Sequence, residues 1–429
     1  MADVTKINGY IIKDANAPHP SNAGSAGQIL KKTETGTEWA DASFKPEGKS
    51  YLTFSSPNSF TLKVNDATKH WDGTLEYFSS NRTWTAWDGT TTLSAVADDG
   101  EYVLYLRGTG NTVIIGNIFG DYKWVLNGSD ISCIGNIENL LDYATVASGS
   151  HPTMASYCYA NMFAGCTSLT QAPTLPATTL AEGCYDGMFR GCTSLTQAPA
   201  LPATTLAATC YNDMFLGCTS LTQAPALPAT TLATYCYDDM FQGCTSLTQA
   251  PALPATTLAE GCYFDMFYRC TALTQAPALP ATTLTTYCYT AMFQGCTSLT
   301  QAPALPATTL AEGCYFEMFF GCTSLKLSST QTGEYTQEYR IPSFGTGMTA
   351  TEALIDMFTD TGGTFTGTPE IDTTYYLSSD NMIVRETEIA TLNGYVGSMI
   401  DGKAPTAITN AKIDEICGTT ILNAEDVVL

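Results

Sequence analysis

Cysteines are the residues of this chain with the widest chemical potential, because a thiol can form a disulfide, bind a metal or act as a nucleophile. The sequence has 429 residues and sixteen cysteines, and fourteen of them form pairs whose members lie eight positions apart. The first members are Cys158, Cys184, Cys210, Cys236, Cys262, Cys288 and Cys314, and the second members are Cys166, Cys192, Cys218, Cys244, Cys270, Cys296 and Cys322.

The spacing argues against zinc and against a disulfide within a pair. No Cys-x-x-Cys occurs, and His19, His70 and His151 lie outside the pairs, whereas structural zinc sites use closely spaced ligands. Positions i and i+8 of one helix lie roughly 12 Å apart, beyond the roughly 7 Å between Cα atoms that a disulfide spans. We therefore interpret the fourteen thiols as small buried core residues, with some disulfides or a bound metal as the alternatives.

The elements that position these cysteines repeat every 26 residues, without an insertion, over seven copies. In the second copy Cys184 and Met188 are four apart, the spacing of an apolar helix face, and Thr179 with Glu182 fits a capping box. Gly191 marks the end of this helix, and SLTQAP with the prolines after it predicts a short strand and an irregular return. Units this small must stack on their neighbours to bury an apolar face, so the sequence predicts a solenoid.

The consensus of the unit is CYxxMFxGCTSLTxAPxLPATTL, with a leucine at the same strand position from Leu169 to Leu325. It resembles the BspA-like leucine-rich repeats of bacterial surface proteins and gut phages, over about 175 residues. This resemblance implies an α/β solenoid of leucine-rich type.

The copies differ mainly two, three and six positions after the first cysteine. On a helix these positions face away from the cysteine and the methionine, so we expect them to meet solvent. Exposed aromatic side chains often mark contact surfaces, but large side chains here could also simply cover the neighbouring helix. In the fifth copy Arg269 replaces the turn glycine, which predicts either a relaxed turn or a strained one. The predicted binding residues are Phe264, Tyr268, Thr290, Gln294, Phe316 and Phe320.

The segments on either side of the repeats complete a multidomain α+β chain. Residues 46–130 contain short alternating segments between Pro, Gly, Asn and Asp, which predicts a β-sandwich. The tryptophans of its two Trp-Asp-Gly sequences either flank turns or stack on sugars. The solenoid is assigned to residues 131–345, with an N-terminal cap that includes an apolar helical stretch from Ile134 to Leu141. Residues 346–429 are assigned to a C-terminal cap, begun by EALIDMF (352–358), and a terminal domain with helical stretches.

Residues 1–45 contain INGYIIKDANA and AGQILKKTETGTEWADAS. This segment resembles the N-terminal segments of tailed-phage fibres and related virion appendages, as LEYFSSNRTWTAWDG resembles a β-domain of phage proteins. The resemblance implies that residues 1–45 attach the chain to other virion proteins, and it implies a homo-oligomer, a trimer above all. It also places the protein in the virion after synthesis in the host cytoplasm, in agreement with an N-terminus that lacks a signal-peptide run.

Composition excludes several classes of function. The formal net charge of −23 disfavours nucleic acid and anionic membranes as partners, and no apolar stretch is long enough for membrane insertion. The chain has no GxSxG, P-loop, HExxH or GxGxxG sequence, so we expect neither an enzyme nor a cofactor. The expected function is a structural phage fibre that adheres to a host-surface glycan or protein. The alternatives are a bacterial surface adhesin with the same repeats and a polysaccharide-degrading tailspike.

Overall fold

The computed structural model describes residues 44–48, 51–116, 122–343 and 352–384, together with the backbone of four strands before residue 44. Most of this structure is strand and turn, and α1 (Asn139–Ala147) is the one helix among the described residues. The helical stretches predicted after residue 384 lie outside these ranges. The four early strands form two antiparallel pairs, β1 (Lys6–Ile7) with β2 (Tyr10–Ile11) and β3 (Gln28–Thr33) with β4 (Gly36–Asp41).

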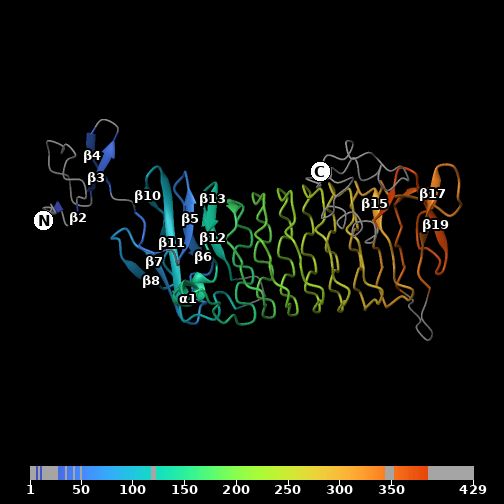
Figure 1. Ribbon diagram of the computed structural model, residues 1–429, viewed down its shortest axis with the longest axis horizontal. Coiled ribbons are helices and arrows are strands. Elements are labelled where there is room, and N and C mark those ends of the chain that lie inside the picture. Colours follow the sequence, from blue (N-terminus) through green and yellow to red (C-terminus); the bar gives the residue numbers. More distant parts are fainter. Residues whose placement is uncertain are drawn as a thin grey trace, which may run out of the picture.

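Two sheets lie at the N-terminal end of the repeats (Figure 1). The larger has the order β14-β13-β5-β11-β7-β8, with β10 paired to β11, and the smaller has the order β12-β6-β9. The strands are β5 (Leu52–Ser56), β6 (Thr61–Val64), β7 (Thr74–Phe78), β8 (Trp84–Trp87), β9 (Leu93–Ser94), β10 (Val96–Asp98), β11 (Glu101–Thr109), β12 (Trp124–Asn127), β13 (Ile131–Ile134) and β14 (Leu169–Gln171).

Aromatic rings join these two sheets. The Trp124 ring of β12 lies 6.5 Å from Phe54 of β5 and 5.5 Å from Trp87 of β8, centroid to centroid. Alternation along β5 produces this packing, because Leu52 and Phe54 point into the core while Thr53 points to the other face. Residues 111–116 (NTVIIG), which belong to the region predicted as a β-sandwich, form no strand, although their isoleucines are buried in the same core.

The larger sheet continues into the repeats, so no structural break occurs at residue 130. β13 pairs antiparallel with β5 on one side and parallel with β14, the first strand of the repeats, on the other. The predicted helical stretch from Ile134 to Leu141 is wrong, because Ile134 ends a strand and α1 begins only at Asn139. One hydrophobic core extends from Leu52 in β5 to Leu377 in the strand β19 (Thr374–Ser378).

The predicted helix of each 26-residue unit is absent. In its place is a chain of turns, which we call the turn ribbon: residues 156–165, 182–191, 208–217, 234–243, 260–269, 286–295 and 312–321. In the second ribbon Gly183, Gly187 and Gly191 have φ of +55°, +56° and +69°. A left-handed residue at every fourth position prevents the i to i−4 hydrogen bonds of an α-helix.

The hydrogen bonds of the turn ribbon alternate between neighbouring units. The Arg190 amide donates to the Gly187 carbonyl within its own ribbon at 3.0 Å, whereas the Phe189 amide donates to Met214 of the next unit at 3.0 Å. Half of the amides therefore tie each unit to the next. A turn ribbon repeats every four residues, close to the period of an α-helix, which is why the apolar spacing of Cys184 and Met188 misled the sequence interpretation.

Ladders of identical side chains fill the interior between stacked units. Tyr159 to Tyr315 and Phe163 to Phe319 form two columns in which successive ring centroids are 5.6 to 5.9 Å apart and nearly parallel. All fourteen cysteines of the repeats are buried and free. Six of the seven second members of the pairs donate their thiol protons to a phenylalanine carbonyl one unit back, as Cys192 does to Phe163 at 3.2 Å, and Cys166 donates to the Trp124 carbonyl at 3.4 Å. A cysteine here is thus a small apolar residue with one weak donor.

An interlock between units replaces the predicted capping box. The Tyr235 hydroxyl donates to the Glu260 carboxylate at 3.4 Å, and its ring lies directly against Gly261. A Cβ added to Gly261 would lie 2.1 Å from the Tyr235 ring. The pairs Tyr157/Gly183 and Tyr287/Gly313 repeat this arrangement, with Glu182 and Glu312 as acceptors. The glutamates therefore bind a tyrosine of the preceding unit and cap no helix.

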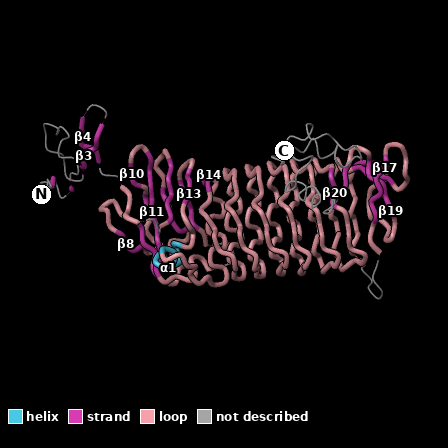
Figure 2. The backbone as a smooth tube through the Cα atoms, viewed as in Figure 1, coloured by secondary structure: helices cyan, strands magenta, loops and turns pink. Residues whose placement is uncertain are grey.

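Further strands lie at the C-terminal end of the stack. The repeats between these strands and the N-terminal sheets are mostly loop and turn (Figure 2). Residues 352–360 form an eighth ribbon without cysteine, in which Phe358 extends the phenylalanine column at 5.6 Å from Phe319. β20 pairs in parallel with β15, and the remaining strands form the sheet β17-β19-β16-β18. The bounds are β15 (Gln301–Pro303), β16 (Lys326–Ser328), β17 (Tyr335–Arg340), β18 (Gly362–Gly363), β19 (Thr374–Ser378) and β20 (Met382–Val384).

Candidate functional site

The residues predicted to bind a partner lie in two neighbouring rows on the turn ribbon. Backbone amides one unit apart donate to the carbonyls of Phe264, Thr290 and Phe316, and the carbonyls of Tyr268, Gln294 and Phe320 are contacted in the same way. These six residues therefore occupy equivalent positions in three stacked units. They lie on a ribbon of turns and not on a helix face.

Their exposure differs from the expectation. Thr290 is only 5% exposed and donates its hydroxyl proton to the Gly313 carbonyl at 2.5 Å. Gln294 is half-buried and donates to the Glu317 carboxylate at 2.6 Å. The prediction that Thr290 meets solvent is wrong, because its position is covered by the next unit. The four aromatic residues, which are Phe264, Tyr268, Phe316 and Phe320, are half-buried and present part of their rings at the ribbon edge.

Carboxylates occupy the ribbon positions two and three residues after the first cysteine in the second to fifth units. They are Asp186, Asp213, Asp238, Asp239 and Asp265, which occupy four consecutive units. Asp213, Asp239 and Asp265 have φ of +56°, +55° and +49°, and aspartate tolerates this left-handed conformation better than most residues do. Backbone geometry thus explains part of the acidic character of this edge.

Burial raises the pKa of these carboxyls, and repulsion between them raises it further. The pKa of Asp238 rises to about 8 and that of Asp239 to about 7, with burial as the largest cause and other aspartates of the row next. The pKa of Asp186 and of Asp265 rises to about 7 for the same two reasons. The Asp213 carboxylate accepts from the Arg190 guanidinium at 2.9 Å, yet burial outweighs this ion pair and its pKa is also raised.

Hydrogen bonding along the acidic row is incomplete within the described structure. The Oδ1 atoms of Asp238 and Asp265 are buried and have no hydrogen-bond partner among the described residues. No group of three or more His, Cys, Asp or Glu residues in the described structure is arranged to hold a metal ion. The row is therefore an electrostatic feature of the fold, and we assign no metal to it.

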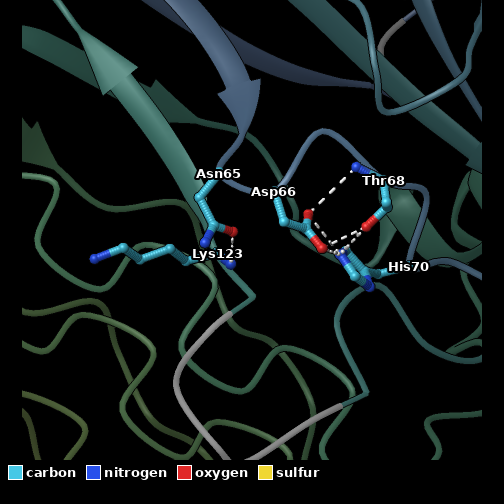
Figure 3. Close-up of polar contacts among 5 residues, drawn as sticks. All are labelled: Asn65, Asp66, Thr68, His70 and Lys123. Atoms are coloured by element: carbon cyan, nitrogen blue, oxygen red, sulfur yellow. Dashed lines mark hydrogen bonds and ion pairs between the residues drawn. The ribbon is translucent and has the colours of Figure 1, made fainter.

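A second polar cluster contains the residue types of a catalytic triad (Figure 3). The His70 Nε2 atom lies 2.9 Å from both the Asp66 carboxylate and the Thr68 hydroxyl, and Thr68 also donates to Asp66. A triad needs the carboxylate on one ring nitrogen and the nucleophile on the other. Here both contact the same nitrogen, so the cluster closes the loop after β6 and does not form a nucleophilic site.

Asp66 is the ionised partner of this cluster. Its burial acts to raise the pKa, but hydrogen bonds from Thr68 and His70 outweigh burial and hold the pKa below its ordinary value. Figure 3 also shows Asn65 beside Lys123, where the Lys123 amide donates to the Asn65 side chain at 2.9 Å and joins this loop to the strand β12. These contacts are structural.

The tryptophans of the two Trp-Asp-Gly sequences are not available for stacking on a sugar. Trp71 and Trp87 are each 3% exposed, and their ring centroids lie 5.1 Å apart in the core. Asp88 accepts from the amides of Thr90 and Thr91, as expected for a residue that stabilises a turn. The turn interpretation fits the second sequence, whereas Asp72 of the first accepts from the distant Thr112 amide at 2.8 Å.

A signal for the turn ribbon was present in the sequence but was missed. Gly183, Gly187 and Gly191 are four apart, and the other copies carry Gly, Asn or Asp at many equivalent positions. These are the residue types that favour positive φ. The alternation of tyrosine and glycine before the first cysteine, as at Tyr235 and Gly261, likewise indicates contact between neighbouring units.

Comparison with protein-family models, curated proteins and solved structures gives no match to this chain. Among the described residues, no helix is long and apolar enough to cross a membrane.

Proposed function

We propose that this chain is a structural virion appendage, a head or tail fibre of a tailed phage, that adheres to the host surface without covalent chemistry. Its proposed architecture is an attachment segment, a β-sandwich and a solenoid of leucine-rich-type repeats with a C-terminal cap. The observation that carries the proposal is the distribution of sequence differences over the stack. The interior ladders are uniform, whereas the differing residues gather on one edge of the turn ribbon.

A uniform interior supports a stiff, elongated body. The columns of tyrosine and phenylalanine rings repeat with nearly constant spacing, so each unit presents its outer residues in fixed register with the next. Rigid presentation lowers the conformational entropy lost on binding. The aromatic side chains at Phe264, Tyr268, Phe316 and Phe320 are of a type enriched at the centres of interfaces.

The test of adhesion compares two double variants at one position of the repeat. Tyr268→Ala with Phe320→Ala removes two aromatic rings, and Leu216→Ala with Gln242→Ala is the matched control in units where the same position is not aromatic. We expect the aromatic variant to bind whole host cells at least about 30-fold more weakly. Loss of a single interface aromatic costs about 2 kcal/mol, which corresponds to about 30-fold in affinity, and the variant loses two. The control is expected to bind as the intact chain does, and equal loss in both variants contradicts the proposal.

Attachment to the particle is tested by removing residues 1–43. The cut precedes Phe44, because the Phe44 ring packs 5.2 Å from Phe78 and is 4% exposed. We expect the shortened chain to bind cells but not purified virions. A bacterial surface adhesin would bind no virion in either form, and a tailspike would release reducing sugar from host polysaccharide.

A further inference from the structure

A pocket of about 540 Å³ opens on the outer face of the larger N-terminal sheet, away from the turn ribbon. Side chains of three adjacent strands line it, with Tyr105 opposite Thr53, Val103 opposite Ser55 and Ile134 also opposite Thr53 in the sheet register. These residues point away from the main core because they alternate with Leu52, Phe54 and Leu104. The volume lies in the range of small-molecule sites.

Two tyrosine hydroxyls are left for a ligand. Tyr51 and Tyr105 line the pocket and are only 7% and 5% exposed, and their rings meet edge to face at 5.3 Å. Neither hydroxyl has a hydrogen-bond partner among the described residues. Neither hydroxyl oxygen is among the buried polar atoms that lack a partner, so both reach the open space of the pocket, where a ligand group could replace water. Burial, then the nearby Asp98 carboxylate, raises the pKa of Tyr105 to about 12, which keeps this hydroxyl a donor.

The pocket wall combines apolar and hydroxyl groups. Ile134 is 44% exposed, and among the described residues Ile371 is the only other large apolar side chain in the exposed class. Val103 lines the same pocket from β11, and Thr53 and Ser55 add two hydroxyls to those of the tyrosines. A sugar ring presents the same two chemistries, because its C–H face is apolar and its edge carries hydroxyls.

Charge at the rim excludes one class of sugar. Among the described residues that line the pocket, Asp98, Asp99 and Glu101 carry carboxylates and Lys45 carries an ammonium group. Asp98 is held in place by the Phe44 amide, which donates to it at 2.7 Å. A carboxylate-bearing sugar would be repelled here, whereas a neutral or amine-bearing sugar would not.

We propose that this pocket binds one non-anionic saccharide unit, with the Tyr51 and Tyr105 hydroxyls bonded to its edge and Ile134 against its apolar face. The inference rests on the proposed function, because such a sugar would be the terminal unit of the host-surface glycan that the fibre contacts. It adds a second contact on the N-terminal sheets to the aromatic edge of the repeats.

The test is binding of the full chain to an array of oligosaccharides that end in glucose, galactose, N-acetylglucosamine, glucosamine, glucuronic acid or sialic acid. The variant Tyr51→Phe with Tyr105→Phe removes both hydroxyls and leaves the rings. We expect the unaltered chain to bind neutral or amine-bearing sugars, and the variant to bind them at least about tenfold more weakly because two hydrogen bonds are lost. The matched control, Tyr235→Phe with Tyr287→Phe, removes two hydroxyls far from the pocket and is expected to bind unchanged.

Absence of binding to every sugar, binding to acidic sugars alone, or equal binding by the pocket variant would overturn the pocket proposal. The melting temperature of each variant is measured alongside. If the tyrosine variant folds poorly, Ile134→Arg takes its place, because this change at an exposed side chain is expected to block the pocket. If the Tyr268/Phe320 variant loses cell binding while the pocket variant still binds sugar as the unaltered chain does, the pocket proposal is rejected and the adhesion proposal stands. Sugar binding through the pocket by a chain that binds no host cells rejects the proposed function.

Discussion

Replacing Gly261 with alanine is expected to lower the free energy of unfolding by about 2 to 4 kcal/mol. Gly261 has φ of +58°, and an alanine pays about 1 kcal/mol or more for that conformation. The new methyl group would also lie 2.1 Å from the Tyr235 ring, which belongs to the preceding unit and cannot move without breaking its contact with Glu260. Urea unfolding followed by circular dichroism measures the change.

Gly243→Ala is the matched control for this effect. Gly243 has φ of +69°, but a Cβ there would meet only the Gly217 backbone at 3.8 Å, an ordinary contact. We therefore expect a loss of about 1 kcal/mol from backbone strain alone. Adding Tyr235→Ala to Gly261→Ala should recover part of the stability, since it removes the clash. Equal losses at Gly261 and Gly243 would show that the interlock between units contributes nothing.

Stability is expected to fall by at least about 3 kcal/mol between pH 5 and pH 8.5 because of the acidic row. Asp186, Asp238, Asp239 and Asp265 have raised pKa values of about 7 to 8 in the folded chain, whereas an unfolded aspartate ionises near pH 4. The folded chain therefore holds protons that the unfolded chain has released. Stability is highest below the unfolded pKa of these groups and is lost as the pH rises through the folded values. Thermal unfolding across this pH range measures the effect.

The variant Asp238→Asn distinguishes the contribution of the acidic row to the pH dependence of stability from that of other titrating groups. Its amide cannot ionise, so the variant should be more stable than the unaltered chain at pH 8.5 and should lose less stability as the pH rises from 5. Asp88→Asn has the opposite sign, because hydrogen bonds from Thr91 and Thr90 lower the pKa of Asp88 to about 2 and its ionised form stabilises the turn. A pH profile of Asp238→Asn that matches the unaltered chain would contradict the electrostatic account.

The fifth copy shows how far local residue preferences predict conformation. Arg269 replaces the turn glycine, and the sequence left open whether that turn relaxes or becomes strained. The structure keeps Arg269 at φ of +57°, with its amide bonded to the Gln294 carbonyl at 2.7 Å. The neighbouring units on both sides hold the ribbon in register. The outcome was decided by contacts 26 residues away, which no local pattern includes.

The sequence by itself determined the 26-residue period, the absence of metal-type cysteine spacing, and most strands between residues 51 and 128. Those features depend on the order of residue types along a short stretch of chain. The tertiary structure decided that the ribbon is turn and not helix, since both conformations bury every fourth residue, and only the ribbon directs alternate amides to the next unit. It also decided which outer residues remain accessible, as the burial of Thr290 shows, and it assembled the pocket at Tyr51 and Tyr105 from strands distant in sequence. Stacking and strand pairing bring together residues far apart in the chain, and this packing sets exposure and electrostatics.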